Sequence, residues 1–192
     1  MRVRLAQQSD IPAIREIYGH YVLHSDYTFD TKIPSVDYLS AQMTFIQERH
    51  AYLVIEEEKG IQGYAYSAMH RKKSAYDWVC EVTIYLNHKA TGKAIGKKLY
   101  DSLIKLAEVQ GYHILLAGIT SPNPMSEKFH EYFGFVPAIR YEHIGFKSGE
   151  WKNVVWWRKE LRDLADTPSP IRVVSSLTLE DLGQAGLEFP EQ

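Results

Sequence analysis

Apolar and polar residues alternate with two different periods along this chain, and each change of period marks the boundary of a predicted element. Over 9–24 and 36–50 the apolar residues recur every three to four positions, which predicts two amphipathic helices. Over 51–57 and 61–70, on either side of the turn EKG, they recur closer to every second position, which predicts a β-hairpin. A short apolar stretch at 3–6 predicts one strand before the helices.

The second half of the chain continues as an alternation of strands and helices. A long strand is predicted at 76–86, and a helix at 92–110 follows it and ends at Gly111. The next run, 113–119, is almost continuously apolar, which is typical of a strand that is buried on both faces and pairs parallel with a neighbour. The remaining elements are a short helix, which ends at Gly134, and two strands; they lie within 122–135, 138–146 and 151–161.

This order of elements predicts an α/β fold with a mixed central sheet of about seven strands, flanked by about four helices. We found no internal repeat, so we expect residues 1–161 to form one domain. Residues 162–192 are more polar and contain prolines. We expect them to form a C-terminal extension of unknown role, with a small turn of helix at 179–182.

Composition and charge narrow the range of functions. The formal net charge is −2, so no basic field indicates a nucleic-acid or membrane partner, and no apolar run approaches the roughly 18 residues of a membrane span. The single cysteine, Cys80, and the lack of an apolar signal segment at the N-terminus suggest a cytoplasmic protein. The eight histidines show no metal-ligand spacing, so we expect no metal site.

The loop within EVTIYLNHKATGKAIGKK, residues 81–98, is a candidate anion site. Gly92 and Gly96 lie where a helix begins, and unpaired backbone N–H groups at such a position favour a phosphate. The spacing fits neither a P-loop nor a Rossmann fingerprint. An ordinary strand–helix turn with solvated lysines is equally compatible with these residues alone.

This loop and its surroundings resemble the GNAT family of acyl-CoA-dependent N-acetyltransferases, in which a Q/R-x-x-G-x-G/A loop binds the pyrophosphate of acetyl-CoA. On this chain the pattern falls on 91–96, with Thr91 in place of Gln or Arg and Ala94 in place of Gly. Thr91 lacks a long donor, and Ala94 is tolerable only if its backbone is helical. The resemblance implies acetyl-CoA as a co-substrate, with this part of its site formed by Thr91, Gly92, Lys93, Ala94, Ile95, Gly96 and Lys97.

Three longer stretches are similar to one branch of that family, the phosphinothricin N-acetyltransferases: SAYDWVCEVTIYL, LAEVQGYHILLAGITSPNPMSEKFHEYFGF and IGFKSGEWKNVVWW. The likeness runs from Arg2 to Leu161. It implies the GNAT fold, a homodimer, and acetylation of a small amino acid or analogue such as phosphinothricin, methionine sulfone or methionine sulfoximine. We expect direct transfer, because Cys80 should face away from Glu81 and has no evident histidine partner.

Glu81 and His130 are the candidate catalytic residues. From the residue alone, Glu81 could be an ordinary strand glutamate at the surface; the resemblance implies a general base that acts through water, and a dry pocket would raise its pKa. His130, in HEYFGF, could donate a proton to the leaving thiolate or relay the proton of the amine. It could also be a structural residue of the helix whose ring nitrogens are already hydrogen-bonded.

The resemblance also implies where the two substrates bind. The long strand should splay from 113–119 and present its backbone to the pantetheine arm, with the start of the short helix close by. The expected contacts are Ile84, Tyr85, Leu86, Asn123 and Ser126. The candidates for the acceptor site are Phe29, Arg71 and Tyr76. Of these, Arg71 carries a guanidinium, which binds a carboxylate or phosphinate bidentately.

Two alternative functions remain open from the sequence. An enzyme of the same fold could act on an antibiotic, a polyamine or a protein N-terminus, although the basic run RKK at 71–73 argues against a polyamine. A non-catalytic acyl-CoA sensor is supported only by the departures at Thr91 and Ala94. The last strand region contains Trp151, Trp156 and Trp157, which makes an aromatic dimer interface plausible.

Overall fold

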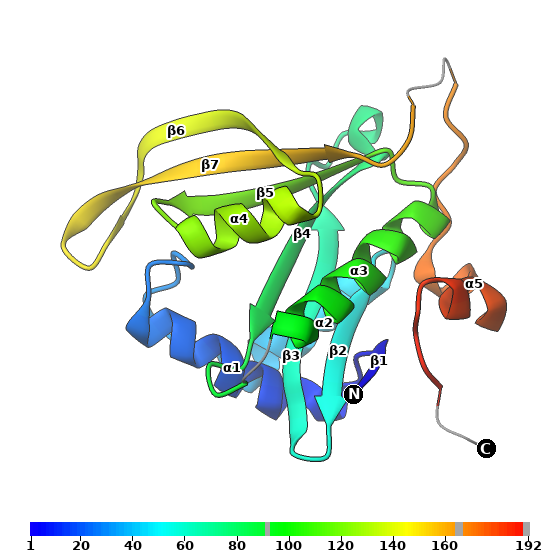
Figure 1. Ribbon diagram of the computed structural model, residues 1–192, viewed down its shortest axis with the longest axis horizontal. Coiled ribbons are helices and arrows are strands. Elements are labelled where there is room, and N and C mark those ends of the chain that lie inside the picture. Colours follow the sequence, from blue (N-terminus) through cyan, green and yellow to red (C-terminus); the bar gives the residue numbers. More distant parts are fainter. Residues whose placement is uncertain (91–92, 164–166, 190–192) are drawn as a thin grey trace.

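A mixed β-sheet forms the centre of the molecule in the computed structural model, which describes residues 1–90, 93–163 and 167–189 (Figure 1). The described residues form seven strands in the order β1-β2-β3-β4-β5-β7-β6. Neighbours pair antiparallel except β4 and β5, which pair parallel. The strands are β1 (Arg2–Leu5), β2 (Tyr52–Glu57), β3 (Gly60–Met69), β4 (Val79–Leu86), β5 (Ile114–Ser121), β6 (Val136–Lys147) and β7 (Glu150–Glu160).

Helices cover both faces of this sheet. α1 and α2 pack on one face, where they close a cluster of buried apolar side chains with β2 and β3. α3 lies across the other face, with α5 beside it (Figure 1). The described part of the chain has five α-helices: α1 (Ile11–His24), α2 (Val36–Gln47), α3 (Lys93–Gln110), α4 (Pro124–Tyr132) and α5 (Leu179–Gln184).

The predicted elements and their ends correspond closely to those observed. Ser35 caps α2, because its side chain accepts a hydrogen bond from the backbone N–H of Tyr38 at 3.1 Å. Gly111 follows α3 with a φ of 100°, the left-handed conformation expected of a glycine at that position. The long strand begins later than predicted, at Val79, because Ser74–Tyr76 form a turn of 3-10 helix, η2.

The prediction that 113–119 is buried on both faces is wrong for one of the two faces. Leu115, Ala117 and Ile119 are buried in the same apolar cluster as side chains of α3, whereas Gly118 between them is exposed. The exposed face of β5 borders a cavity described below. The continuous apolar run therefore belongs to a strand that has one face in the core and the other beside a cavity.

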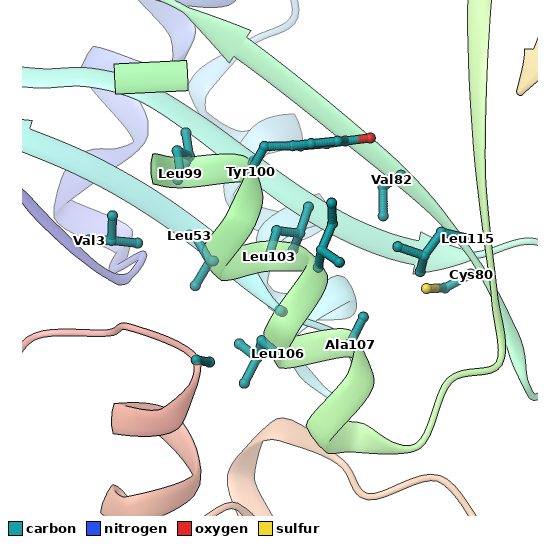
Figure 2. Close-up of a cluster of buried hydrophobic side chains, with 14 of the residues drawn as sticks. Val3, Leu53, Cys80, Val82, Leu99, Tyr100, Leu103, Leu106, Ala107 and Leu115 are labelled. Atoms are coloured by element: carbon teal, nitrogen blue, oxygen red, sulfur yellow. The ribbon is translucent and has the colours of Figure 1, made fainter. Parts of the chain in front are cut away.

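The main core lies under α3 (Figure 2). Leu99, Leu103 and Leu106 of α3 have no exposed surface and pack towards the sheet, where Leu53 and Cys80 are also fully buried. Burial of a leucine side chain contributes about 1.5 to 3 kcal/mol, so this helix is firmly held. The N-terminal end of α3 is thereby fixed against the sheet.

The C-terminal extension packs onto the outer side of α3. Val174, Leu182, Ala185 and Leu187 belong to the same buried cluster as the helix. The backbone N–H of Glu188 donates to the carbonyl of Val3 at 2.8 Å, next to the edge strand β1. A helix, α5, begins at Leu179, where a turn of helix was predicted. The extension thus covers both α3 and the edge of the sheet.

Candidate active site

The parallel strands β4 and β5 pair over only three residues and then diverge. Their pairs are Val79 with Ile114, Cys80 with Leu115 and Glu81 with Leu116. Beyond Glu81 the two strands run apart, as Figure 1 shows. The splay expected from the resemblance is therefore present, and Glu81 stands at its vertex.

A cavity of about 280 Å³ lies between the separated strands. Its walls are the diverging halves of β4 and β5, the start of α4, and tyrosines from the end of α1 and the loop after it. The lining residues include Ile84, Tyr85, Leu86, Gly118, Thr120, Asn123, Ser126, His130, Tyr21 and Tyr27. Strand edges that have lost their neighbour leave backbone N–H and C=O groups that can bind an extended ligand.

The alternation of the β4 backbone shows which of its residues face this cavity. Asn87 donates its N–H to Gln62 on the β3 side, and residues two apart in a strand point to the same edge. The backbone groups of Tyr85 and Thr83 therefore face β3, and those of Ile84 and Leu86 face the open edge. The Leu86 carbonyl already accepts the hydroxyl of Tyr21 at 2.7 Å, which leaves Ile84 as the principal backbone contact for a ligand.

Glu81 lies on the face of β4 that is opposite to the main core. Its carboxylate Oε1 is 2.8 Å from Nδ1 of His70, which directly follows β3. The Glu81 side chain is 35% exposed. It therefore exchanges with water more easily than the dry pocket considered from the sequence would allow, and it can act through a water molecule.

Cys80 faces the other way, as the strand period predicted. It is fully buried in the core under α3, and burial raises the pKa of its thiol. A buried, protonated thiol is a poor nucleophile. This arrangement favours direct transfer over a route through an enzyme thioester.

His130 lies on the wall of the cavity and is almost fully buried against Tyr100 and Phe135. Its Nδ1 is 2.8 Å from the carbonyl of Ser126; a carbonyl can only accept, so Nδ1 carries the proton. Burial lowers the pKa of His130, so the ring is neutral and Nε2 is an acceptor. His130 can therefore take up a proton and pass it on, but it cannot donate to a thiolate before it has accepted one.

Asn123 and Ser126 are at the N-terminal end of α4, and both line the cavity. The Oδ1 atom of Asn123 accepts the N–H of Ser126 at 3.2 Å, so Asn123 is a helix cap. The amide group Nδ2 remains able to donate into the cavity. The two roles that the sequence left open for Asn123 are thus compatible.

The predicted pyrophosphate loop is only partly placed. Thr91 and Gly92 lie outside the described residues, and α3 begins at Lys93. Ala94 is helical, which satisfies the condition on its backbone. Ile95 is buried in the main core, and Lys97 Nζ lies 3.5 Å above the ring of Tyr132 in α4.

Gly96 allows α3 to approach the cavity wall closely. A Cβ atom at this position would lie 2.9 Å from Leu86 and 3.5 Å from Phe129, and both of these side chains line the cavity. Any larger residue would push one of them into the space between the strands. Close packing therefore accounts for this glycine without any contact to a phosphate.

The acceptor candidates lie on the Glu81 side of the sheet but are not all brought together. Tyr76, in η2, is 5.8 Å from His70 between ring centroids, so it is near Glu81. Arg71 is exposed in the turn that follows His70. Phe29 is in the loop between α1 and α2 and packs on β6, where a Cβ at Gly145 would overlap its ring.

A second cavity, of about 350 Å³, opens beside Glu81 on this face. Its floor includes Ala68 and Thr83, and its wall is the C-terminal half of α2 with Phe45 and Ile46. The space is large enough for a small amino acid. No local pattern in the chain predicts this cavity, because α2 and β3 come together only through the fold.

The loop between α1 and α2 is tied to the β6–β7 hairpin by three polar contacts. Buried Lys147 donates to the carbonyl of Thr28 at 2.8 Å, and Ser148 and Lys152 bond to Asp26 at 2.8 and 2.9 Å. Burial lowers the pKa of Lys147, and the negative charges of Asp26 and Asp30 partly offset this decrease. The stretch IGFKSGEW therefore holds the loop that carries Phe29.

Sequence reasoning missed His70 and Lys147, and it expected Trp156 at a dimer interface rather than beside His70. His70 follows the hairpin strand with the same parity as Ala68, the partner of Glu81, so the hairpin register could have placed it near the carboxylate. Trp156 and Lys147 depend on long-range packing, for which the chain has no local signal. Among the described residues, no group of three or more His, Cys, Asp or Glu is placed to hold a metal, and no helix is long and apolar enough to cross a membrane.

Comparison with known proteins agrees with this geometry. The acetyltransferase (GNAT) domain family matches residues 3–156. A phosphinothricin N-acetyltransferase of Streptomyces viridochromogenes is 30% identical over 177 residues, which cover 92% of this chain and 96% of the relative. An L-methionine sulfoximine/L-methionine sulfone acetyltransferase of Salmonella typhimurium is 32% identical over 170 residues, with coverages of 86% and 97%.

A solved structure gives the same result for the fold. The crystal structure of a GNAT superfamily phosphinothricin acetyltransferase from Sinorhizobium meliloti, in complex with AcCoA, matches with a TM-score of 0.83 at 30% identity. The match covers 91% of this chain and 95% of that one. The resemblance and the fold inferred from the sequence are both confirmed.

Proposed function

Because the chain belongs to the acetyltransferase (GNAT) family and is an acetyl-CoA-dependent N-acetyltransferase, we propose that its acceptor is a small amino acid or analogue. Phosphinothricin, methionine sulfone and methionine sulfoximine are the compounds to test first. One observation carries the mechanism: the β4–β5 pairing ends at Glu81, so a carboxylate stands where the strand edges open. Both relatives compared above carry names that point to acceptors of this kind.

The residues around the first cavity fit the extended arm of acetyl-CoA. The cavity has the open edge of β4 on one side and the start of α4 on the other. Ile84 offers backbone groups, and Asn123 offers its amide to the arm. The co-substrate supplies the activated acetyl thioester, and the N-terminal end of α3 is where its phosphates would be held.

The proton chemistry is assigned to Glu81 and His130. Glu81 takes a proton from the acceptor ammonium, directly or through water, so that the nitrogen lone pair becomes a nucleophile. The backbone N–H of Ile84 is positioned to stabilise negative charge on the carbonyl oxygen. As the C–N bond forms, the attacking nitrogen must lose a second proton; neutral His130 can accept it at Nε2 and deliver it to the sulfur as the C–S bond breaks.

Arg71, Tyr76 and Phe29 are assigned to acceptor binding. The exposed Arg71 guanidinium can swing to meet the acceptor carboxylate, and Tyr76 is close to Glu81 through His70. Phe29 would close the site from the loop that Lys147 anchors. The acceptor side chain would extend into the cavity beside Phe45 and Ile46.

A thiol-release assay tests this function. The protein is mixed with acetyl-CoA and, separately, with methionine sulfone, methionine sulfoximine, phosphinothricin, unmodified amino acids and spermidine. We expect rapid release of CoA thiol with one or more amino-acid analogues and a much lower kcat/KM with spermidine. Spermidine as the best acceptor would contradict the proposal, and no release with any amine would favour an acyl-CoA sensor.

We also propose a cytoplasmic homodimer. Of the three tryptophans expected at the interface, Trp157 is buried in the core and Trp156 is half-buried against His70, whereas Trp151 is exposed. Exposed apolar side chains on the edge strand β6 and on β7, Trp151 among them, support an interface there: Ile139, Ile144, Phe146 and Trp151. Light scattering at micromolar concentration should give twice the mass of one chain, and a monomer mass would reject the dimer.

A further inference from the structure

The ring of His70 is held in one orientation beside Glu81. His70 directly follows β3, two residues after Ala68, and Ala68 pairs with Glu81. Its side chain is only 18% exposed, although it lies at the end of a strand. Rings from two other elements meet it edge-on: Tyr76 of η2 at 5.8 Å and Trp156 of β7 at 5.9 Å between centroids. A surface histidine that merely chanced on a carboxylate would lack this packing.

The same packing connects His70 to β5, the other arm of the splay. Trp156 pairs with Gly118 of β5, and a Cβ at Gly118 would lie 3.5 Å from the Trp156 ring. Gly118 lines the first cavity. His70 is thus fixed by the hairpin strand, the turn before β4, and the strand next to β5, all of which surround the vertex at Glu81.

The contact between His70 and Glu81 has a definite direction. With Glu81 ionised, its oxygen can only accept, so Nδ1 of His70 carries the hydrogen in the 2.8 Å contact. That bond occupies Oε1 and leaves Oε2 to take a proton. When the acceptor ammonium loses its proton, the N–H bond breaks, an O–H bond forms at Oε2, and the electron pair stays on nitrogen.

We propose that His70 is a positioning residue that holds the Glu81 carboxylate with Oε2 turned toward the acceptor amine. This inference rests on the proposed function, because it concerns the base of that reaction. The groups around the His70 ring are the Glu81 carboxylate, the Tyr76 phenol and the uncharged Trp156 indole. Among them, Glu81 is the one hydrogen-bonded to the ring in the described structure.

Two substitutions separate the hydrogen bond from the packing. His70→Phe keeps an aromatic ring between Tyr76 and Trp156 but removes the donor. His70→Asn loses the ring but places an amide N–H close to the position of Nδ1. We expect His70→Phe to lower kcat for the best acceptor by roughly ten- to a hundredfold, the effect of a misplaced catalytic group, with KM for acetyl-CoA unchanged. His70→Asn should recover part of the loss.

A double-mutant cycle with Glu81→Gln shows whether His70 acts through Glu81. In the Glu81→Gln background, His70→Phe should cost little more, because the carboxylate that it positions is already absent. An equal loss in both backgrounds would mean that His70 acts independently, and a wild-type kcat for His70→Phe would overturn the proposal outright.

A spectroscopic measurement remains informative even if no acceptor is found. Long-range ¹H–¹⁵N spectra of the intact protein, at a pH where the His70 ring is neutral, report which ring nitrogen carries the proton. We expect the Nδ1–H form in wild type and a shift toward the Nε2–H form in Glu81→Gln. An Nε2–H ring in wild type would refute the pairing, whereas the expected tautomer without acetyl transfer would refute only the proposed function.

Discussion

At the scale of single residues, the site depends on side chains whose surroundings define what each can do. The strand period placed Glu81 and Cys80 on opposite faces, and the structure has them there. The period could not reveal that pairing with β5 ends at Glu81, since that depends on two strands far apart in sequence. It also could not give the protonation of His130, which follows from a contact with the Ser126 carbonyl.

Arg71 provides a residue-scale test of the acceptor assignment. Arg71→Ala should mainly raise KM for amino-acid acceptors, because about 1.5 to 3 kcal/mol of charged hydrogen bonding is lost, while the affinity for CoA stays nearly the same. Arg71→Lys should restore only part, since a point charge cannot make the bidentate pair. Steady-state kinetics with methionine sulfone and phosphinothricin give the answer; an unchanged KM in Arg71→Ala would remove Arg71 from the pocket.

At the scale of elements, the loop between α1 and α2 is held in place by a stretch of the β6–β7 hairpin that takes no part in the reaction itself. The stretch IGFKSGEW was recognisable by its resemblance to a family, but its purpose was not. In the structure Gly145 makes room for the Phe29 ring, and Lys147 bonds to the carbonyl of Thr28. Such contacts join segments more than a hundred residues apart, so no local pattern predicts them.

Replacement of the Lys147 anchor should loosen this loop. Lys147→Met keeps the buried apolar stem but removes the bond to Thr28, which should lower the free energy of unfolding by about 1.5 to 3 kcal/mol and raise KM for the acceptor. Lys32→Met, at an exposed position of the same loop, is the matched control and should change neither. Equal stability and KM in the two variants would show that the loop is held by other contacts.

The helix of the C-terminal extension offers a matched pair of leucines. Leu182 is 6% exposed and belongs to the main core, whereas Leu179 is 69% exposed in the same helix. Leu182→Ala should lower the free energy of unfolding by about 2 to 5 kcal/mol, and Leu179→Ala should stay within about 0.5 kcal/mol of wild type. Urea denaturation measures both. If the two substitutions cost the same, the extension does not share the core of the domain.

At the scale of the whole molecule, the order of strands and helices was largely predictable, because each element has a clear apolar period and recognisable ends. The splay, the second cavity and the covering of α3 by the extension were not, because they arise only when elements meet. The boundary proposed at 161 therefore separates the family-like region from a segment that packs onto the same core.

Whole-molecule stability should depend on pH through His50. This ring is buried; its Nδ1 bonds to the Tyr112 hydroxyl at 2.9 Å, and its Nε2 has no partner among the described residues. Burial lowers the pKa of His50 from 6.5 to about 4. The imidazole of His50 therefore binds a proton less tightly in the folded state than in the unfolded state. The free energy of unfolding is highest above pH 6.5, where the ring is neutral in both states, and it decreases as the pH falls toward 4.

The size of this effect can be measured against variants that lack the titrating ring. A shift of this size corresponds to about 3 kcal/mol between pH 7 and pH 4. We expect His50→Asn to lose less stability than wild type over that range in urea titrations, and His143→Asn, at an exposed position, to behave like wild type. Parallel pH curves for wild type and His50→Asn would contradict the assignment.

The most direct test of the account is the turnover of Glu81→Gln. The variant should fold and should keep the rise in melting temperature that CoA causes in wild type, since binding to the folded state stabilises it by mass action. Its kcat with the best amino-acid acceptor at pH 7 should fall by roughly 10² to 10⁴, the usual contribution of a general base, and should partly recover as the pH rises and free amine becomes common. A wild-type kcat at pH 7, with CoA binding intact, would show that the carboxylate at the vertex of the splay is structural and that the proposed mechanism is wrong.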